Sequence, residues 1–205
     1  MKKLDFNTKS GLFLIATMMI GLTITAGLDN DPIVMKLEVE QREPLFPKDE
    51  RDAYIREQEQ FISREISCLA LNMYFEARGE DRTGQDAVGF VTLNRVKSKT
   101  YPDTVCEVIY QADTTTSGFP LRNRCQFSWY CDGRPDIADE HIYNEIEKRA
   151  EYIYVNYYLN SGYIDDITGG STHYHATYVE PFWSTHENYQ QVASIGSHVF
   201  YRPTY

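Results

Sequence analysis

Residues 66–95, ISCLALNMYFEARGEDRTGQDAVGFVTLNR, decide how this chain folds. Between residues 62 and 77, apolar residues recur at spacings of three and four, which is typical of a helix face packed on a core. These residues are Ile62, Ile66, Leu69, Met73 and Ala77. Glu76 follows Leu69 by almost two full turns, so it projects from the same apolar side. Because a carboxylate there is costly to bury unless it is paired, protonated or in a cleft, we select Glu76 as the candidate catalytic residue.

The second half of this stretch predicts another helix packed behind the first. Gly79 suits a left-handed cap at the end of the first helix. Thr83, with Asp86 three positions later, predicts the N-cap of the second helix. The buried side of this second helix consists of Ala87, Val88, Val91 and Val96. The expected arrangement is a helix that ends at a cleft, with one acid at its mouth.

The rest of the chain predicts helices first and strands afterwards. Residues 139–159 show helical spacing and predict a long helix capped by Asp136 or Asp139. Residues 101–111 are a short helix or strand, and the turn-rich residues 112–124 predict a surface loop beside the cleft. The tail, which begins near a Gly-Gly turn, reads as short strands. This order of elements indicates an α+β fold.

Composition bounds the function. With 205 residues, 42% of them hydrophobic, the chain can hold one buried domain and an appendage. A net charge of −10 argues against a nucleic-acid partner, because phosphate contacts need clustered Lys and Arg. The 16 tyrosines offer flat apolar faces with polar tips, which suit a saccharide cleft, although we expect most of them to serve packing.

The N-terminal residues 1–28 have the layout of a signal peptide or membrane anchor. Three lysines precede an uncharged apolar run of 18 residues, which is long enough to span a bilayer marginally. A buried core helix is the alternative, and the position at the N-terminus disfavours it. The sequence leaves open whether the segment is cleaved, which would give a secreted protein, or retained as a transmembrane anchor. In the second case the domain would face the periplasm or cell wall. Residues 29–48, with three prolines, read as a spacer before a domain at 49–205.

Four ordered blocks carry a resemblance to a known family. They are CLALNMYFEARGEDRTGQDAVGFVTLNRV at 68–96, YPDTVCEVIYQ at 101–111, CQFSWYCDG at 125–133 and IGSHVFY at 195–201. Together they resemble the cell wall hydrolases typified by the spore cortex-lytic enzymes, over about residues 64–201. Asp86 departs from the family pattern, which has a small or apolar residue there. The resemblance implies a lysozyme-like helical core with a smaller β subdomain.

The resemblance also implies an activity. The family resembles lytic transglycosylases, in which one glutamate cleaves the bond between N-acetylmuramic acid and N-acetylglucosamine, so the expected partner is the peptidoglycan glycan strand and no cofactor is expected. Glu76 would be that glutamate, while Glu80 and Asp132 are the acids near the motifs that could serve as a second carboxylate. Arg78 is expected to face away from Glu76 or to pair with Glu80. The alternatives are a catalytically silent, membrane-tethered wall-binding module and, less favoured for want of a zinc triad, an amidase.

Substrate contacts are predicted from two of the blocks. The match of the 126–129 block predicts contact with substrate, with Gln126, Phe127 and Ser128 as candidates. On an extended segment Gln126 and Ser128 would point one way and Phe127 and Trp129 the other, so that one pair could bond the sugar while the other packs in the core; the alternative is a half-buried strand. Farther along, the comparison with the family predicts that Tyr174, His175 and Trp183 line the cleft, although a structural role fits each of them equally well.

The cysteines predict disulfides. Four cysteines in an exported chain, Cys68, Cys106, Cys125 and Cys131, favour two bridges, and three pairings are possible. The sequence does not choose among them. The Cys125–Cys131 loop is short enough to close locally, in which case Cys68 would meet Cys106. A metal site is disfavoured, because the cysteine and histidine spacings match no zinc motif. His173 and His175 fall on the same side of a predicted strand and could form a metal pair, but the resemblance to the family implies cleft lining here instead of metal ligation.

Overall fold

One long helix carries the first part of the structure. The computed structural model describes residues 47–160 and 163–204, and its first helix, α1, spans Lys48–Ala77. The predicted Glu76 helix is therefore the second half of one continuous element, which is exposed along most of its first half and buried or half-buried from Glu65 onward. The predicted signal or anchor segment and residues 29–46 of the predicted spacer lie outside the described residues. Among the residues described, no helix is both long and apolar enough to cross a membrane.

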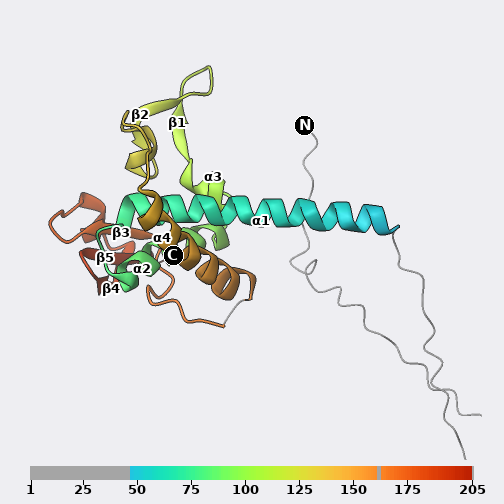
Figure 1. Cartoon of the computed structure of the whole chain (residues 1–205). Coiled ribbons are helices and arrows are strands. Elements are labelled where there is room, and N and C mark those ends of the chain that lie inside the picture. The colour runs from blue at the N-terminus through green and yellow to red at the C-terminus, as the bar shows by residue number, and fades with distance from the viewer. Residues whose placement is uncertain (1–46, 161–162, 205) are drawn as a thin grey trace, which may run out of the picture. The chain divides into compact units, whose positions relative to one another are not determined.

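The remaining elements follow α1 in the order shown in Figure 1. The helical elements after it are α2 (Arg82–Lys97), α3 (Val105–Ile109), η1 (Ser128–Cys131), α4 (Glu140–Ile153), the π-helical η2 (Tyr154–Leu159) and η3 (Phe182–Thr185). The strands are β1 (Ala112–Thr114), β2 (Pro120–Cys125), β3 (His173–Ala176), β4 (Tyr189–Ile195) and β5 (His198–Pro203). The four α-helices described precede the larger sheet, so the predicted mixed α and β organisation is confirmed.

The junction between α1 and α2 differs from the prediction. Gly79 does not adopt a positive φ, and the Glu80 amide closes the end of α1 by donating to the Ala77 carbonyl at 3.0 Å. The N-cap of α2 is Asp81, whose carboxylate accepts a 2.9 Å hydrogen bond from the Gly84 amide. The predicted caps at Gly79 and Thr83 are therefore wrong, because a tighter turn brings an earlier carboxylate to the start of α2.

The most deeply buried helix is α2. Twelve of its 16 residues are buried, including four on the predicted apolar side. Val88 and Leu93 belong to the helical core with α1, α3 and α4, while Ala87 and Val91 pack against Phe200 of β5. This helix therefore lies between the helical layer and the sheet, and its polar side chains can reach both.

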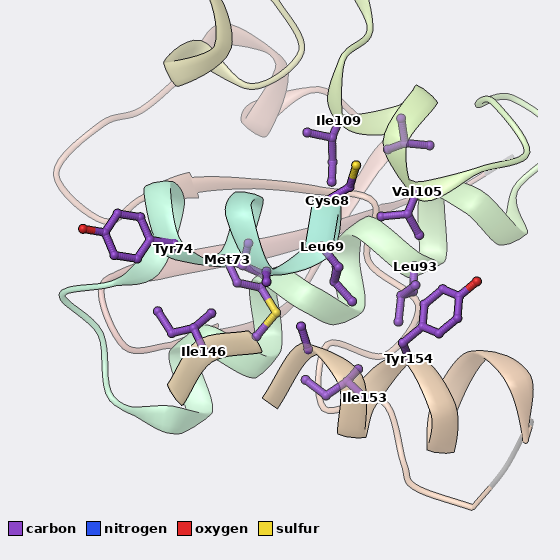
Figure 2. Packing of buried hydrophobic residues seen from close by; sticks show 14 of the residues in the cluster. Cys68, Leu69, Met73, Tyr74, Leu93, Val105, Ile109, Ile146, Ile153 and Tyr154 are labelled. Atoms are coloured by element: carbon purple, nitrogen blue, oxygen red, sulfur yellow. The ribbon is translucent and has the colours of Figure 1, made fainter. Parts of the chain in front are cut away.

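The helical core joins α1 to α4. Figure 2 shows Leu69 and Met73 of α1 facing Ile146 and Ile153 of α4. The N-cap of α4 is Asp139, one of the two predicted residues, and its carboxylate accepts a 3.0 Å hydrogen bond from the Ile142 amide. The predicted long helix over 139–159 thus consists of α4 and the π-helical turn η2.

Two antiparallel sheets complete the fold. β1 and β2 form an exposed hairpin where a loop was predicted, because its strands bury no apolar face that the sequence pattern could reveal. The second sheet has the order β3-β5-β4, and its register pairs Tyr174 with Phe200. A turn with positive φ at Gly169 (58°) and Gly170 (82°) precedes it, as predicted.

All four cysteines are paired. Cys68 of α1 is bonded to Cys106 of α3, and Cys125 at the end of β2 is bonded to Cys131 of η1. The first bridge closes a separation of 38 residues and the second a separation of 6. A bridge of this kind typically stabilises a fold by about 2–4 kcal/mol, more for the longer loop.

Candidate active site

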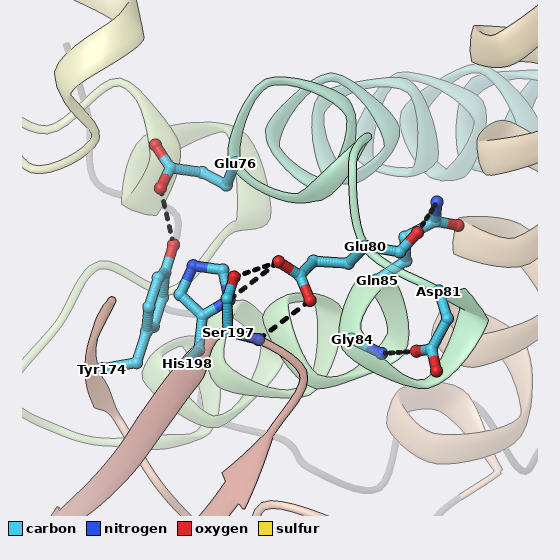
Figure 3. A network of polar contacts seen from close by, with 8 residues as sticks. All are labelled: Glu76, Glu80, Asp81, Gly84, Gln85, Tyr174, Ser197 and His198. Carbon is cyan, nitrogen blue, oxygen red and sulfur yellow. Dashed lines mark hydrogen bonds and ion pairs between the residues drawn. The ribbon is translucent and has the colours of Figure 1, made fainter. Parts of the chain in front are cut away.

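The candidate site is built around Glu76, in the last turn of α1. Its side chain is half-buried, and Oε2 accepts a 2.9 Å hydrogen bond from the Tyr174 hydroxyl (Figure 3). Burial raises the pKa of Glu76, while the Tyr174 hydrogen bond and the charge of Arg95 act in the opposite direction. The net upward shift of the pKa suits a group that must donate a proton at a pH above the ordinary carboxyl range.

The strand that bears Tyr174 is anchored by two buried polar residues of α2. The Asn94 side-chain amide donates to the Ser171 carbonyl at 3.0 Å, and Arg95 Nε donates to the Thr172 carbonyl at 2.8 Å. These bonds form where water is excluded, so they hold the backbone ahead of β3 firmly. As a result Tyr174 emerges on the face of β3 that is turned toward α1.

A second buried network fixes η1 beside the end of α1. Asn72, one turn before Glu76, donates to the Thr92 hydroxyl at 3.1 Å and accepts from the Trp129 indole at 3.0 Å. The Phe75 ring stacks on Trp129 with the ring centroids 4.8 Å apart. The block that contains η1 is therefore held next to the candidate acid by both polar and aromatic contacts.

The second motif glutamate, Glu80, serves a different purpose. Its Oε2 accepts a 3.0 Å hydrogen bond from the Ser197 amide, and the Ser197 hydroxyl donates to Oε1 (Figure 3). Nδ1 of His198 lies 3.9 Å from Oε1. The Ser197 hydroxyl is the main cause of a lowered pKa for Glu80, and burial opposes it. Gly196 has φ of +56°, and a Cβ there would overlap the Glu80 carboxylate.

The three residues of the 126–128 block that were predicted to contact substrate differ in exposure. Gln126 and Ser128 are exposed, as the alternation predicts, but η1 begins at Ser128, so the segment turns instead of staying extended. Phe127 is only 3% exposed, and the Arg95 guanidinium lies 4.9 Å from its ring centroid. Its position is that of a support for Arg95 and not that of a surface contact.

The predicted contacts near β3 lie on two faces of the sheet. Tyr174 points toward Glu76, whereas His175, the next residue, points the other way and shares a 3.1 Å hydrogen bond with the Tyr201 hydroxyl. The Trp183 ring packs with this second group, 5.7 Å from His175 and 5.3 Å from Tyr201 between centroids. The structure thus brings one of the three to Glu76 and places the other two together elsewhere.

The remaining charged candidates are occupied by other contacts. Asp132 accepts a 2.7 Å hydrogen bond from the Arg134 amide. Arg78 faces away from Glu76, one of the two predicted outcomes, and its guanidinium lies 5.1 Å from the Tyr74 ring centroid. Across residues 47–160 and 163–204, no group of three or more His, Cys, Asp or Glu side chains could hold a metal ion.

The sequence matches a family described as Cell Wall Hydrolase over residues 79–201, more than half of the chain. The chain belongs to this family. Glu76 lies just ahead of the matched segment, so the family match does not itself include the candidate acid.

Two spore cortex-lytic enzymes are among the relatives of this cell wall hydrolase. The enzyme of Halalkalibacterium halodurans is 30% identical over 143 residues, which cover 68% of this chain and 35% of that enzyme. The enzyme of Bacillus cereus is 30% identical over 146 residues, which cover 68% of this chain and 45% of that enzyme. The chain therefore matches less than half the length of either relative.

Two solved structures are also similar. The catalytic domain of the Bacillus cereus SleB protein is 27% identical and aligns over 67% of this chain and 89% of that domain, with a TM-score of 0.46. The catalytic domain of the germination-specific lytic transglycosylase SleB of Bacillus anthracis is 28% identical and aligns over 67% of this chain and 93% of that domain, with a TM-score of 0.45.

Asn72, Arg95 and Ser197 are among the residues of this site that the sequence reasoning did not single out. Asn72 lies between Leu69 and Glu76 on the apolar stripe, and Arg95 follows Val91 by four residues on the buried side of α2, so a polar side chain on a buried face was the available signal. No comparable signal marks Ser197, because its partner Glu80 is 117 residues earlier.

Proposed function

We propose that this cell wall hydrolase cleaves the glycan strand of peptidoglycan, between N-acetylmuramic acid and N-acetylglucosamine, with Glu76 as general acid. The observation that carries the proposal is a half-buried glutamate at a helix end whose pKa is raised by burial. A glycosidic oxygen is a poor leaving group, and a carboxylic acid kept protonated by burial can supply the proton it needs. Family membership and the spore cortex-lytic relatives support a cell-wall substrate.

We further propose that the reaction is that of a lytic transglycosylase. Glu76 gives its proton to the bridging oxygen as the bond from that oxygen to the muramic C1 breaks. The muramic 6-hydroxyl oxygen then bonds to C1, and its proton returns to the Glu76 carboxylate. The state of Glu80 supports this route over a water-activating second carboxylate, because both of its oxygens are held by Ser197.

Mass spectrometry of digested peptidoglycan tests both statements. We expect fragments with 1,6-anhydro-muramic ends. Reducing muramic ends would mean hydrolysis through a second base and would overturn the transglycosylase route while leaving the bond assignment intact. Freed stem peptides would instead indicate an amidase. Binding to the wall without any released product would indicate a silent binding module.

We also propose an arrangement in which the domain at 49–205, with a lysozyme-like helical core, acts outside the cytoplasm. In this arrangement residues 1–28 direct export as a signal peptide or membrane anchor, and residues 29–48 are a spacer. The paired cysteines support an oxidising compartment. Cell fractionation with sizing of the mature chain tests it: a soluble product that begins near residue 27 would rule out the anchor, and a full-length cytoplasmic product would overturn export.

A further inference from the structure

Arg95 is a buried arginine with an incomplete set of partners. It is 4% exposed, its Nε donates to the Thr172 carbonyl, and its Nη1 has no hydrogen-bond partner among the described residues. The guanidinium lies over two aromatic rings, 4.9 Å from the Phe127 centroid and 5.5 Å from the Tyr101 centroid. Burying a charge with an open donor is costly, so a packing role alone does not explain its presence.

Another arginine shows what a complete set of partners looks like. Arg149 of α4 donates from Nε to one oxygen of Asp86 at 2.6 Å and from Nη2 to the other at 2.5 Å. Its charge is balanced by an adjacent carboxylate, as in an ordinary structural ion pair. Arg95 bonds only a neutral carbonyl, and Glu76 is the carboxylate with which its charge interacts.

The groups around Glu76 come from separate elements. The Tyr174 hydroxyl of β3 donates to Glu76, and Arg95 of α2 donates to the Thr172 carbonyl, two residues before Tyr174. Behind Tyr174, the His198 ring of β5 lies 5.3 Å away between centroids, and its Nδ1 is 3.9 Å from Glu80. Arg95 is therefore the buried cation of this cluster, joined to Glu76 through Thr172 and Tyr174 of one segment, and its charge lowers the pKa of Glu76. The Glu80–His198 pair lies on the other side of the Tyr174 ring.

We propose that Arg95 is a positioning residue for the reaction, whose fixed guanidinium stabilises the Glu76 carboxylate each time Glu76 gives up its proton. The inference rests on the proposed function, because a group that acts as acid and then as base must be stable in both forms. Burial favours the protonated form of Glu76, and the Arg95 charge favours the ionised form. Thr172 and the two rings keep the guanidinium in place without neutralising it.

Substitution of Arg95 tests the proposal. Arg95→Met removes the charge, Arg95→Gln also keeps a donor for Thr172, and Arg95→Lys keeps the charge. Arg78→Met is the matched control, because this exposed arginine is two residues from Glu76 but faces away from it. The pKa of Glu76 is read by carboxyl carbon NMR, with Glu76→Gln used to assign the signal, so this readout does not depend on activity.

We expect the pKa of Glu76 to shift upward in both neutral variants, to stay near the wild-type value in Arg95→Lys, and not to move in Arg78→Met. The basic limb of the pH profile of kcat/KM should move to higher pH in the same variants. Turnover should fall about tenfold with KM little changed, less than the 10²–10⁴-fold expected for loss of the acid itself. If one of Arg95→Met and Arg95→Gln does not fold, the Glu76 pKa measured in the other tests the proposal.

An unshifted Glu76 pKa in a folded neutral variant would overturn the role of Arg95. That result would leave the proposed function intact, provided Glu76→Gln is inactive. Activity in Glu76→Gln would overturn the proposed function instead, whatever the NMR titration of the Arg95 variants shows.

Discussion

The last turn of α1 and the loop that follows it each hold one glutamate, and the two carboxylates have opposite environments. Both are largely shielded from water: Glu76 is half-buried, and the Glu80 side chain is 16% exposed. Glu76 receives one hydrogen bond, from Tyr174, and its pKa is raised. Glu80 receives two, both from Ser197, and its pKa is lowered.

The difference lies in which effect on the pKa is largest: burial for Glu76, and the hydrogen bond from the Ser197 hydroxyl for Glu80. Burial raises the pKa of both, but in Glu80 the two donors and the nearby His198 outweigh it. When their environments shift the pKa values of two acids in opposite directions, the two acids can take different roles. Here Glu76 is suited to proton transfer, and Glu80 is suited to anchoring the turn between β4 and β5. The experiments below test this division of roles.

The largest effect should come from Glu76→Gln. We expect clearing of a cell-wall suspension to fall by about 10²–10⁴-fold, the usual contribution of a general acid, while the thermal unfolding midpoint is retained. Glu57→Gln is the control, because it removes an equal charge from an exposed site on α1. Clearing by Glu76→Gln at nearly the wild-type rate would show that the acid lies elsewhere.

Gly196→Ala should disrupt the contact between Glu80 and the β4–β5 turn by adding a side chain on the turn. A Cβ would overlap the Glu80 carboxylate and would sit on a backbone with positive φ, so we expect unfolding free energy to fall by about 3 kcal/mol. Gly118 also has a positive φ (83°) but has open space around it, so the cost of Gly118→Ala should be smaller. Urea titration measures both, and equal losses would mean that the carboxylate does not fill this space. In a Glu80→Ala background the loss at Gly196 should shrink.

Ser197→Ala removes one of the two donors to Glu80. Because a hydrogen bond to a charged group contributes about 1.5–3 kcal/mol, we expect a loss of stability near the lower end, since the backbone amide remains. Ser194→Ala, at an exposed position on β4, should have almost no effect. Activity should be retained in both variants at temperatures where they are folded; a selective loss of turnover in Ser197→Ala would mean that Glu80 takes part in the chemistry.

The smallest effects are expected in the pH dependence of stability, with opposite signs. The folded pKa of Glu80 is lowered, so its contribution is present above its ordinary value of 4.5 and is lost as the pH falls through the folded pKa. The folded pKa of Glu76 is raised, so its contribution is present below 4.5 and is lost as the pH rises through the folded pKa. The unfolding free energies of wild type, Glu76→Gln and Glu80→Gln should be measured at several pH values around 4.5. The difference from wild type should change with pH in opposite directions for the two variants, and a change in the same direction would contradict the opposite environments of Glu76 and Glu80.

Local spacing predicted the long helices and one turn, but not the caps at the α1–α2 junction or the β1–β2 hairpin. The period of three and four in α1 and α4, the Asp139 cap and the Gly169-Gly170 turn all follow from residues close together in the chain. The caps at Gly79 and Thr83 were predicted wrongly because several residues nearby could cap a helix and the geometry of the turn selected one. The exposed β1–β2 hairpin gives no apolar alternation to recognise.

The sequence by itself determined that Glu76 lies on the packed side of its helix, because helical periodicity is a local property. Only the tertiary structure decided what meets it there. Tyr174 is 98 residues away in the chain, and its hydroxyl reaches Glu76 because Arg95 and its neighbour on α2 anchor the start of β3. The role of Glu80 was likewise decided by Ser197. The pKa of a carboxylate depends on the donors and charges within a few ångströms, and packing between distant segments brings them there.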